Sequence, residues 1–592
     1  MQFRRFRLKF RKRLMRGQQQ VEGFSQQAEA NLDKHFFRRL SRLSVVWRFI
    51  TAWLLLFVVL AGCLVVQLQG LSGHYQVVRP MAGGTFTEGV LGTFTNANPL
   101  FARGLVNETV SHLVFAGLFT YDSQNHLVGN LARGYDVDAR GTTYTVHLKP
   151  NLTWQDGQRL TADDVVFTYH TIQNPDVQSP LASGWDGIAV AKKDAYTVTF
   201  TLPNPLGSFP YTLTNGIVPA HLLDHVAASD LRSNDFNTIH PVGSGPFEWS
   251  ALQVENSEPA HARVLIALKP FAGYVGGQPK LEGFVVSTYA NQEQLVAAFR
   301  KQKVDSLVGL SSPPSDLSSN MNVQHYDPLL TAETMTFFNT TSPVMNDAAV
   351  RRSLVQATDT AAIRSKLGYT TRAVDEPLLP GQLGYDRTYR QSGYDVAAAK
   401  AGLDKAGWIT GHDGVRSKGV LVLEVNLYAA NTPENSLVTH LLRHYWQAVG
   451  AKVQLHLLGD QDLQSAVNSH DYDALLYGIS IGVDPDVFVY WDSSQTDPRS
   501  TRLNLSLYKS AAADASLEAG RTRLDPSLRI IKYRPFLQAW QQDAPALALY
   551  QPRFVYITDK KLYGFDAKVL NTPADRLNQV QAWEFRTAKV TD

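Results

Sequence analysis

Residues 144–172 read YTVHLKPNLTWQDGQRLTADDVVFTYHTI, and the spacing of apolar residues changes within this stretch. From Tyr144 to Leu148 apolar residues alternate with polar ones, which is typical of a half-buried strand. Thr161 can then cap a helix, because Asp164 stands three residues later and can return the bond. The apolar stripe of that helix comprises Val165, Tyr169 and Ile172. The stretch therefore predicts a strand followed by a helix.

The same two spacings recur farther along the chain. Residues 196–202 alternate again and predict another strand. Val420–Tyr428 and residues 453–457 also predict strands, with a helix between them that ends at Gly450. The apolar face of that helix comprises Leu437, Leu441, Tyr445 and Ala448. A further strand is predicted over Asp473–Ser480. Strand, helix and strand in under 40 residues indicate a βαβ unit, so the expected fold class is mixed α/β.

Length and composition limit the class of protein. The chain has 592 residues, of which 44% are apolar and 18% are charged. This composition suits large packed cores and argues against global disorder. A length about three times that of an ordinary domain predicts several domains. The single Cys excludes an intrachain disulfide scaffold and a Cys-rich metal site.

One segment has the length and composition of a membrane span. Residues 49–66, FITAWLLLFVVLAGCLVV, are 18 residues without a charge. As a helix they would span about 27 Å, close to the thickness of the hydrocarbon core of a bilayer. Residues 1–48 hold 13 Lys and Arg against 3 Asp and Glu, so this basic tail is predicted to stay in the cytoplasm. The one-sided charge disfavours the alternative, a buried core helix. We therefore predict a single-pass protein of the cell membrane whose body is extracytoplasmic, at the cell surface or in the periplasm.

The charge of the body argues against a nucleic-acid partner. The basic tail carries +10, which leaves −7 for the rest of a chain whose total is +3. Because the body is mildly acidic, we expect no nucleic acid among its partners.

The only cysteine, Cys63, lies within the apolar segment. Leu60-Ala61-Gly62-Cys63 resembles the lipobox of bacterial lipoprotein signals, in which the cysteine is lipidated after cleavage. The apolar run continues past Cys63, however, and the region before it is long for a signal. The sequence favours an uncleaved signal anchor, with lipidation of Cys63 as the alternative.

Signatures of catalysis are missing from the sequence. It has no H-E-x-x-H, no G-x-S-x-G and no G-x-x-x-x-G-K-[ST] motif. His440 and His444 lie four residues apart on the predicted helix, and we interpret them as a solvated face rather than a metal site. An anchored hydrolase is therefore disfavoured. We predict a binding protein that is not an enzyme and has no cofactor.

A set of ordered motifs identifies a resemblance. The most specific is Trp154-Gln155-Asp156-Gly157 followed by LTADDVVF over residues 160–167. The others are residues 95–100 (TNANPL), 114–122 (VFAGLFTYD), 241–247 (PVGSGPF), 271–279 (FAGYVGGQP), 350–354 (VRRSL), 395–408 (DVAAAKAGLDKAGW) and 484–486 (DPD). Together they resemble the family 5 extracellular solute-binding proteins, the peptide, oligopeptide and nickel receptors of bacterial ABC importers. The resemblance covers roughly residues 84–560.

The resemblance implies a two-lobed periplasmic-binding-protein-like fold (type II, cluster C) with an inserted extra domain, preceded by one N-terminal transmembrane helix. A linker is expected over residues 67–83. Lobe I would combine residues 84–118, 239–305 and 550–592, the inserted domain would be residues 119–238, and lobe II would be residues 306–549. The ligand would bind between the lobes, and the closed form would dock on the permease subunits of an ABC transporter.

The resemblance also implies which residues contact the ligand. In this family a peptide lies extended, and its backbone pairs with the protein as an added strand would. The expected contacts are Asn96, Tyr428, Ala429, Ala430, Asn431, Tyr477, Gly478, Ile479, Ser480 and Asp484. The alternative for Tyr428 and Tyr477 is ordinary strand packing.

The sequence departs from the family at two ionic contacts. Residues 479–483 contain no acid to hold a peptide amine, and residues 428–431 contain no Arg for a carboxylate. A zwitterionic dipeptide would lose two charge-assisted hydrogen bonds, which favours peptides longer than a dipeptide or neutral ligands. Two alternatives stay open: a receptor for a non-peptide ligand (oligosaccharide or metal chelate), and a surface sensor or adhesin of the same fold without transport.

Overall fold

The computed structural model describes residues 46–591, apart from residues 257, 259–261, 319, 321, 370 and 498–502. Most of the basic tail predicted over residues 1–48 therefore lies outside the described residues. The chain divides into two compact units, residues 1–79 with 587–592, and residues 80–586.

The first unit contains the apolar helix. Helix α3 runs from Trp47 to Tyr75, and its stretch Trp47–Gln67 has a mean hydropathy of 2.8 with none of it buried, long and apolar enough to cross a membrane. Strand β1 (Gln76–Met81) follows and pairs with β26 (Arg586–Thr591). The expected linker over residues 67–83 is thus mostly regular structure. No proline interrupts residues 67–75, so the helix continues beyond the apolar segment.

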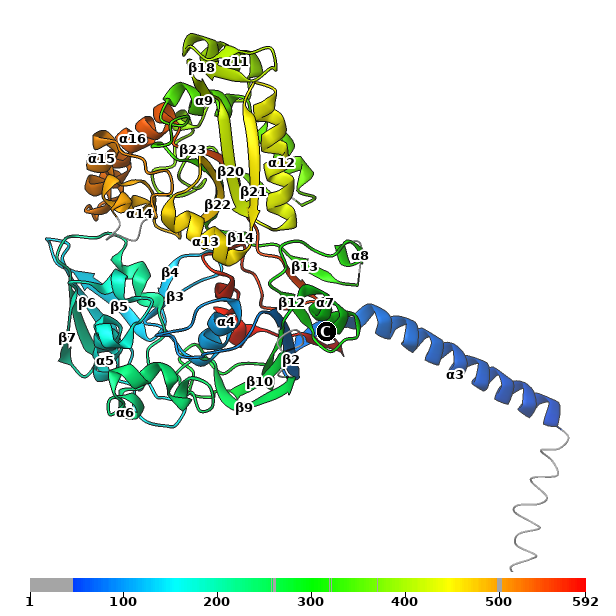
Figure 1. Ribbon diagram of the computed structural model, residues 1–592. Coiled ribbons are helices and arrows are strands. Elements are labelled where there is room, and N and C mark those ends of the chain that lie inside the picture. The colour runs from blue at the N-terminus through cyan, green and yellow to red at the C-terminus, as the bar shows by residue number, and fades with distance from the viewer. Residues whose placement is uncertain are drawn as a thin grey trace, which may run out of the picture. The chain divides into compact units, whose positions relative to one another are not determined.

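The second unit begins with lobe I, which is built on a seven-stranded sheet in the order β13-β24-β12-β2-β11-β10-β9 (Figure 1). Strand β2 is parallel to both β11 and β12, and the other recorded pairs are antiparallel. The strands are β2 Thr85–Leu91, β9 Phe247–Asn256, β10 Arg263–Pro270, β11 Gly283–Tyr289, β12 Ser306–Val308, β13 Gln324–Tyr326 and β24 Tyr556–Thr558. Its helices are α4 Leu105–Val114, α7 Gln292–Arg300 and α8 Ser315–Ser318.

This sheet corrects one predicted boundary. Strands β12 and β13 were expected in lobe II, which was predicted to begin at residue 306. They lie instead in the sheet of lobe I, because β12 pairs in parallel with β2 and buries Leu307 and Val308 there.

The inserted domain has a four-stranded antiparallel sheet in the order β5-β6-β8-β7. Its elements are β3 Phe119–Tyr121, β4 Leu127–Gly129, β5 Ala132–Val137, β6 Thr143–Leu148, α5 Ala162–Gln173, β7 Ala189–Asp194, β8 Thr197–Thr201 and α6 Ala220–Leu223. Thr161 caps α5 as predicted: its N–H donates to Asp164 Oδ2 at 2.8 Å and its hydroxyl accepts from Asp163 N–H at 3.3 Å. The predicted stripe Val165, Tyr169 and Ile172 is fully buried.

Lobe II is an α/β layer structure. Its sheet has the order β16-β23-β15-β22-β20-β21, in which β20 is parallel to both β21 and β22. The strands are β15 Ala332–Phe338, β16 Arg372–Ala373, β20 Glu424–Ala430, β21 Lys452–Leu458, β22 Ala474–Ser480 and β23 Ala546–Gln551. Helix α12 (Pro433–Gln447) packs on one face, and α15 (Ala511–Arg521) and α16 (Pro526–Asp543) pack on the other (Figure 1). The predicted βαβ unit is confirmed.

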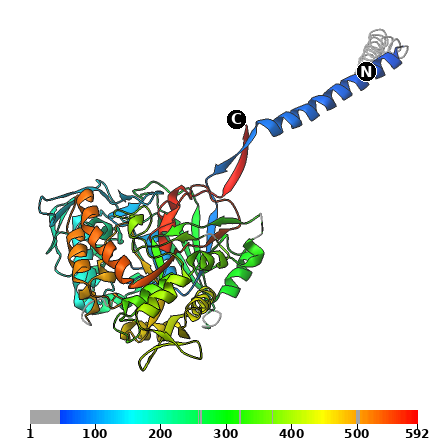
Figure 2. The same cartoon turned by 90° about the horizontal axis from the view of Figure 1, so that it is seen from above.

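Smaller elements complete lobe II. The helices are α9 Ala348–Gln356, α10 Thr360–Lys366, α11 Val396–Lys405, α13 Asp460–Ser469 and α14 Phe488–Trp491. A separate three-stranded sheet consists of β17 Ile409–Thr410, β18 Arg416–Lys418 and β19 Leu421–Val422. Figures 1 and 2 both place α15 and α16, drawn in orange, on the same side of the molecule as the inserted domain, drawn in cyan and green.

Two details of the βαβ unit differ from the prediction. The buried face of α12 consists of Val438, Thr439, Leu442 and Trp446, one residue on from the predicted Leu437, Leu441 and Tyr445. Trp446 decides this rotation, because its ring is fully buried and its Nε1–H donates to Thr358 Oγ1 at 3.0 Å. Val420 lies in the exposed turn between β18 and β19, so the strand predicted from Val420 is divided into β19 and β20.

Two chain segments cross between lobe I and lobe II, residues 327–331 and residues 551–555. They lie side by side: Leu330 N–H donates to Pro552 O at 2.9 Å, and Gln551 Nε2 donates to Leu330 O at 2.8 Å. Strand β14 (Leu329–Leu330) also pairs in parallel with β25 (Val569–Leu570). We call these two stretches the crossing segments. The two segments are therefore adjacent.

Candidate functional site

The predicted contact segments meet at one edge of the lobe II sheet. Strands β20, β21 and β22 are parallel and end at Ala430, Leu458 and Ser480. Their carboxyl ends therefore lie at the same edge, which is where ligands bind in open α/β sheets. Asn431 N–H donates to Leu458 O at 2.8 Å and continues the ladder past the end of β20. The structure thus brings the predicted segments 428–431 and 477–480 together.

The pairing at this edge is incomplete on one side of β22. Strands β20 and β22 pair at Leu427–Ala474 and Tyr428–Leu475, whereas β22 continues to Ser480. On its other side β22 pairs with β15 along its whole length, up to Ala332–Ser480. Residues 476–480 therefore have one backbone edge that β20 does not cover, and an extended chain can pair there.

The predicted contact side chains divide into two groups. Ala429 and Ile479 are buried in the cores of lobe II, so only their backbone is left for a ligand. Asn431, Gly478 and Ser480 are exposed, and Ala430 and Tyr477 are half-buried. Tyr428 is also half-buried and stacks on His456, with ring centroids 4.3 Å apart. Tyr428 and Tyr477 therefore take part in packing as well as bordering the edge.

Asp484 and Asn96 are committed to internal partners. The Asp484 carboxylate receives two hydrogen bonds from Arg529, each 2.6 Å long, and both side chains are buried. Asn96 is buried in lobe I, where its side chain accepts from Asn98 N–H at 2.7 Å and its own N–H donates to Asn107 Oδ1 at 3.2 Å. Each residue thus fixes local structure.

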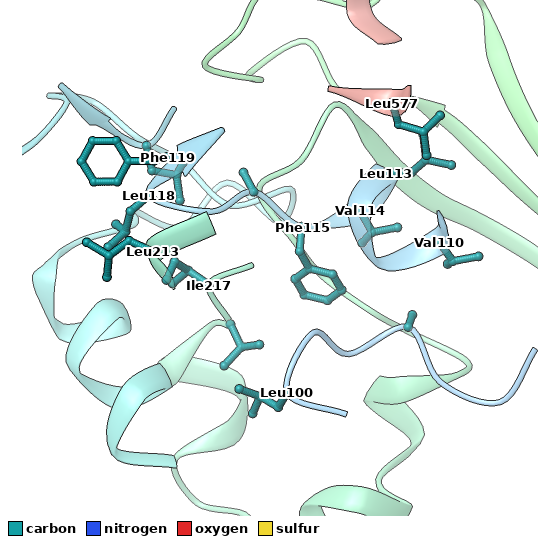
Figure 3. Packing of buried hydrophobic residues seen from close by; sticks show 14 of the residues in the cluster. Leu100, Val110, Leu113, Val114, Phe115, Leu118, Phe119, Leu213, Ile217 and Leu577 are labelled. Carbon is teal, nitrogen blue, oxygen red and sulfur yellow. The ribbon is translucent and has the colours of Figure 1, made fainter. Parts of the chain in front are cut away.

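A cavity lies where lobe I meets the inserted domain. Its volume is about 480 Å³, within the size range of small-molecule sites. Its lining includes Phe119, Tyr121, Trp185, Asn215, Tyr274 and Asp575. Figure 3 shows the packing around the same junction: Val110, Leu113 and Val114 come from α4, Leu577 from the C-terminal segment, and Leu118, Phe119, Leu213 and Ile217 from the inserted domain and its border (Figure 3).

Tyr121, which lines this cavity, is affected by burial and by nearby charges. Tyr121 is buried, and burial is the main cause that raises its pKa; the charges of Asp575, Tyr211 and Asp484 raise it further. Asp484 belongs to lobe II, whereas Tyr121 and Tyr211 belong to the inserted domain. Sequence reasoning did not select Tyr121 as a site residue, although it lies in the motif VFAGLFTYD over residues 114–122.

The inserted domain also touches lobe II directly. Ser208 Oγ lies 2.9 Å from Asp486 Oδ2, and Arg521 Nη2 lies 3.2 Å from the same oxygen. Gly207 N–H donates to Arg521 O at 2.9 Å. These contacts, together with the crossing segments, join the two sides of the molecule at separate places.

A buried acid that sequence reasoning also missed lies beside β22. Glu333 on β15 is the register partner of Ile479 and is fully buried. Neither of its carboxylate oxygens has a hydrogen-bond partner among the described residues. Burial raises the pKa of Glu333 well above its usual range, and the charges of Glu376 and Asp375 raise it further.

The part of the chain that the structure describes contains no group of His, Cys, Asp and Glu arranged to hold a metal ion. His440 and His444 lie on α12, where His440 Nδ1 is 2.7 Å from the Arg443 guanidinium. A cation beside the ring disfavours metal binding by this pair.

Comparison with known proteins decides the family. The profile of the bacterial extracellular solute-binding proteins, family 5 Middle, matches residues 126–500. The chain belongs to this family. It is therefore an extracytoplasmic solute-binding protein of the ABC-transporter class and not an enzyme, and its apolar N-terminal helix is a signal or an anchor. The predicted family and fold class are confirmed.

The relatives bind different solutes. The oligopeptide-binding protein AppA of Bacillus subtilis is 24% identical over 541 residues, which cover 89% of this chain and 97% of AppA. The structure of AppA in complex with a nonapeptide has a TM-score of 0.70 at 23% identity, covering 86% of this chain and 100% of AppA. NikZ of Campylobacter jejuni, solved in complex with Ni(L-His), has a TM-score of 0.71 at 22% identity and covers 84% of this chain and 99% of NikZ. AgaA of A. tumefaciens R10, solved with agropinic acid, has a TM-score of 0.66 at 21% identity and covers 85% of this chain and 99% of AgaA.

Proposed function

We propose that this chain is the membrane-anchored substrate-binding protein of an ABC importer and captures peptides between its two lobes. The observation that carries the proposal is the incompletely paired edge of β22 over residues 476–480, at the carboxyl ends of the parallel strands. An extended peptide satisfies its backbone hydrogen bonds by adding to such an edge. The cavity beside Tyr121, where lobe I meets the inserted domain, offers room for ligand side chains.

Backbone pairing suits a receptor that accepts many sequences. Backbone pairing recognises the main chain, which all peptides share. The side chains can then occupy a cavity that does not select one sequence. A micromolar complex needs a net binding free energy of only about −8 kcal/mol. The rest of the interaction energy can therefore shift the population from open to closed lobes.

The charge of the site favours peptides longer than a dipeptide. Asp484, the acid nearest to the end of β22 in sequence, is already paired with Arg529. Residues 428–431 contain no Arg for a ligand carboxylate. A dipeptide would have to bury its terminal carboxylate beside residues 428–431 without a charged partner. A longer peptide can place its terminal carboxylate away from these residues.

Closure requires a division of the chain into moving parts. We assign lobe I to residues 84–118, 239–331 and 551–586, the inserted domain to residues 119–238, and lobe II to residues 332–550. The crossing segments act as the hinge, since they are the two covalent connections between the lobes. The closed form docks on the permease subunits.

Helix α3 serves as the anchor, with its N-terminus in the cytoplasm. Cys63 is exposed on this helix, and the uncleaved anchor leaves it unmodified. Intact mass spectrometry of the membrane-extracted protein tests this assignment. A chain that keeps its residues before Cys63 supports the anchor, and a shorter chain with an acylated Cys63 shows a lipoprotein.

Peptide capture is tested with the full chain in detergent. A peptide panel of several lengths is screened by thermal unfolding, and a peptide at about 100 times its Kd should add about 2.7 kcal/mol of stability. Native mass spectrometry of the protein from its source identifies any co-purified ligand. If no peptide raises the unfolding temperature and no peptide co-purifies, the proposal is wrong.

A non-peptide solute is the second candidate, and two findings favour it. Both ionic contacts for a dipeptide are missing, and the similar structures NikZ and AgaA hold Ni(L-His) and agropinic acid. A co-purified metal chelate, sugar or opine-like acid would decide for this candidate.

A further inference from the structure

Two buried carboxylates of lobe II lack a complete set of partners among the described residues. Glu333 and Glu376 are both fully buried. Neither oxygen of Glu333 has a hydrogen-bond partner among the described residues, and Glu376 has one free oxygen, Oε2. The other oxygen of Glu376 accepts from Asp386 N–H at 3.0 Å. No ion pair joins either group to a Lys or Arg in the described part of the chain.

The groups that act on these carboxylates are mostly acids. Asp375 and Glu376, from the segment after β16, both act on Glu333 and raise its pKa. Burial raises the pKa of Glu376 to about 8; the Asp386 N–H opposes this, while the charges of Asp375 and Asp386 add to it. Tyr490 on α14 is also affected. Burial is the main cause that raises its pKa to about 12, and the charge of Glu333 is the next.

These groups lie at the edge where the peptide is proposed to bind. Glu333 pairs in register with Ile479, on the part of β22 that β20 does not cover. The Tyr490 hydroxyl donates to Ser480 O, the end of β22, at 2.5 Å. From the segment that carries Glu376, Gln382 Nε2 donates to Gly482 O at 2.7 Å. Three elements around the acids thus contact the end of β22.

Glu333 also lies close to the crossing segments. It is two residues from Thr331, whose carbonyl accepts from Ile481 N–H at 2.8 Å and from Gly482 N–H at 3.1 Å. Glu333 thus lies next to the crossing segment that we propose as part of the hinge.

We propose that Glu333, together with Glu376, binds a positively charged group of the ligand at the end of β22. The ligand would be a peptide whose α-amino group, or a Lys or Arg side chain, reaches these carboxylates. The inference rests on the proposed peptide-binding function and narrows it to cationic peptides. It also replaces the acid that the sequence lacks over residues 479–483.

The physical reason is the cost of burying acids without partners. A carboxylate removed from water without a hydrogen bond or counter-ion is strongly disfavoured, and neighbouring acids increase the penalty. A cation from the ligand supplies both charge and N–H donors, and such charge-assisted bonds are about twice as strong as neutral ones. Because no Lys or Arg among the described residues forms an ion pair with these groups, we take the ligand as the source of the cation.

The test uses the full chain in detergent and matched peptide pairs. Each pair differs only in a free or acetylated N-terminus, or in Lys against norleucine, and binding is measured by calorimetry. The charged member should bind about ten- to a hundredfold more tightly to the natural protein. Glu333→Gln should remove most of this preference and leave binding of the neutral member nearly unchanged.

Further variants keep the result interpretable. Glu376→Gln should also reduce the preference for the charged peptide. This variant replaces Glu333→Gln in the test if Glu333→Gln does not fold. Glu424→Gln, a half-buried acid at the start of β20 paired with Lys452, should keep the full preference. Equal binding of charged and neutral peptides, or a preference unchanged in both variants, overturns the role of Glu333 but leaves peptide capture standing. If neither member of any pair binds, peptide capture fails and this inference fails with it.

Discussion

Two fully buried glutamates, one in each main sheet, have opposite surroundings. Glu88 on β2 of lobe I forms an ion pair with Arg576 and accepts from the Tyr556 hydroxyl at 3.0 Å. Arg576 also donates to Thr109 Oγ1 at 2.9 Å, so the pair ties β2, α4 and the C-terminal segment together. Glu333 on β15 of lobe II is equally buried and has no such partner among the described residues.

The difference separates a structural acid from one kept for a ligand. A buried charge with a complete set of partners is neutral or mildly costly, and it specifies how distant segments meet. A buried acid without partners lowers stability, and such local conflicts concentrate at functional sites. The contrast therefore assigns Glu88 to the fold of lobe I and Glu333 to binding.

The largest effect is expected from breaking the complete pair. Arg576→Met leaves the Glu88 charge buried and unpaired, which should lower the free energy of unfolding by about 3–5 kcal/mol. Urea unfolding of the full chain in detergent measures it. The double variant Glu88→Met with Arg576→Met should recover much of the loss, and a single variant as stable as the natural protein would contradict the structural role of the pair.

The incomplete site should show itself in the pH dependence of stability. An unfolded glutamate ionises near pH 4.5, whereas Glu376 in the folded chain does so near pH 8. The folded state therefore holds the proton more tightly, and its stability should fall as pH rises through this window, by on the order of a few kcal/mol. Glu376→Gln should flatten the profile measured by thermal unfolding. A natural protein and variant with parallel profiles would show that Glu376 is already ionised without cost.

Glu333→Gln should have the opposite sign to Arg576→Met. Removing the charge from an unpartnered buried acid should raise the free energy of unfolding of the ligand-free protein by about 1–2 kcal/mol. Chemical unfolding at pH 7 measures the change. If the variant is instead less stable than the natural protein, Glu333 has a structural partner and the contrast with Glu88 disappears.

The smallest effect is expected at the surface. Glu424 lies on the same sheet as Glu333 but is solvated and pairs with Lys452 at 3.0 Å. Exposed pairs contribute little, because water and salt screen them. Glu424→Gln should leave the free energy of unfolding and the affinity for peptides unchanged within experimental error. A clear loss of either would show that the number of acids in lobe II, rather than their burial, determines its stability and binding.

The sequence predicted local structure well where the signal was local. Thr161 and Asp164 form the expected capping box because both partners are three residues apart. The predicted face of α12 is one residue away from the observed face. Trp446 determines the observed face through its hydrogen bond to Thr358, and local spacing cannot predict a partner so far away in sequence. The pairing of β12 with β2 could not be predicted for the same reason, since more than 200 residues separate the two strands.

The site was predictable only in part. The segments 428–431 and 477–480 were selected because the family motifs flank them, and the structure brings them to one edge; their contact with a ligand stays a prediction. Glu333 was not found, because nothing local distinguishes TAETMTFF over residues 331–338 from an ordinary strand. The proposed role of Glu333 depends on the charges of Asp375 and Glu376, which act on it only in the folded chain.

The adjacency of the crossing segments has a consequence for how such receptors diversify. Lobe II is one uninterrupted stretch whose two ends meet at Leu330 and Gln551, joined by a hydrogen bond of 2.8 Å. It is therefore a cassette that can be exchanged between relatives by two cuts at neighbouring points. A swap of this kind would carry Glu333 and its neighbouring acids into a new host while leaving the sheet of lobe I intact.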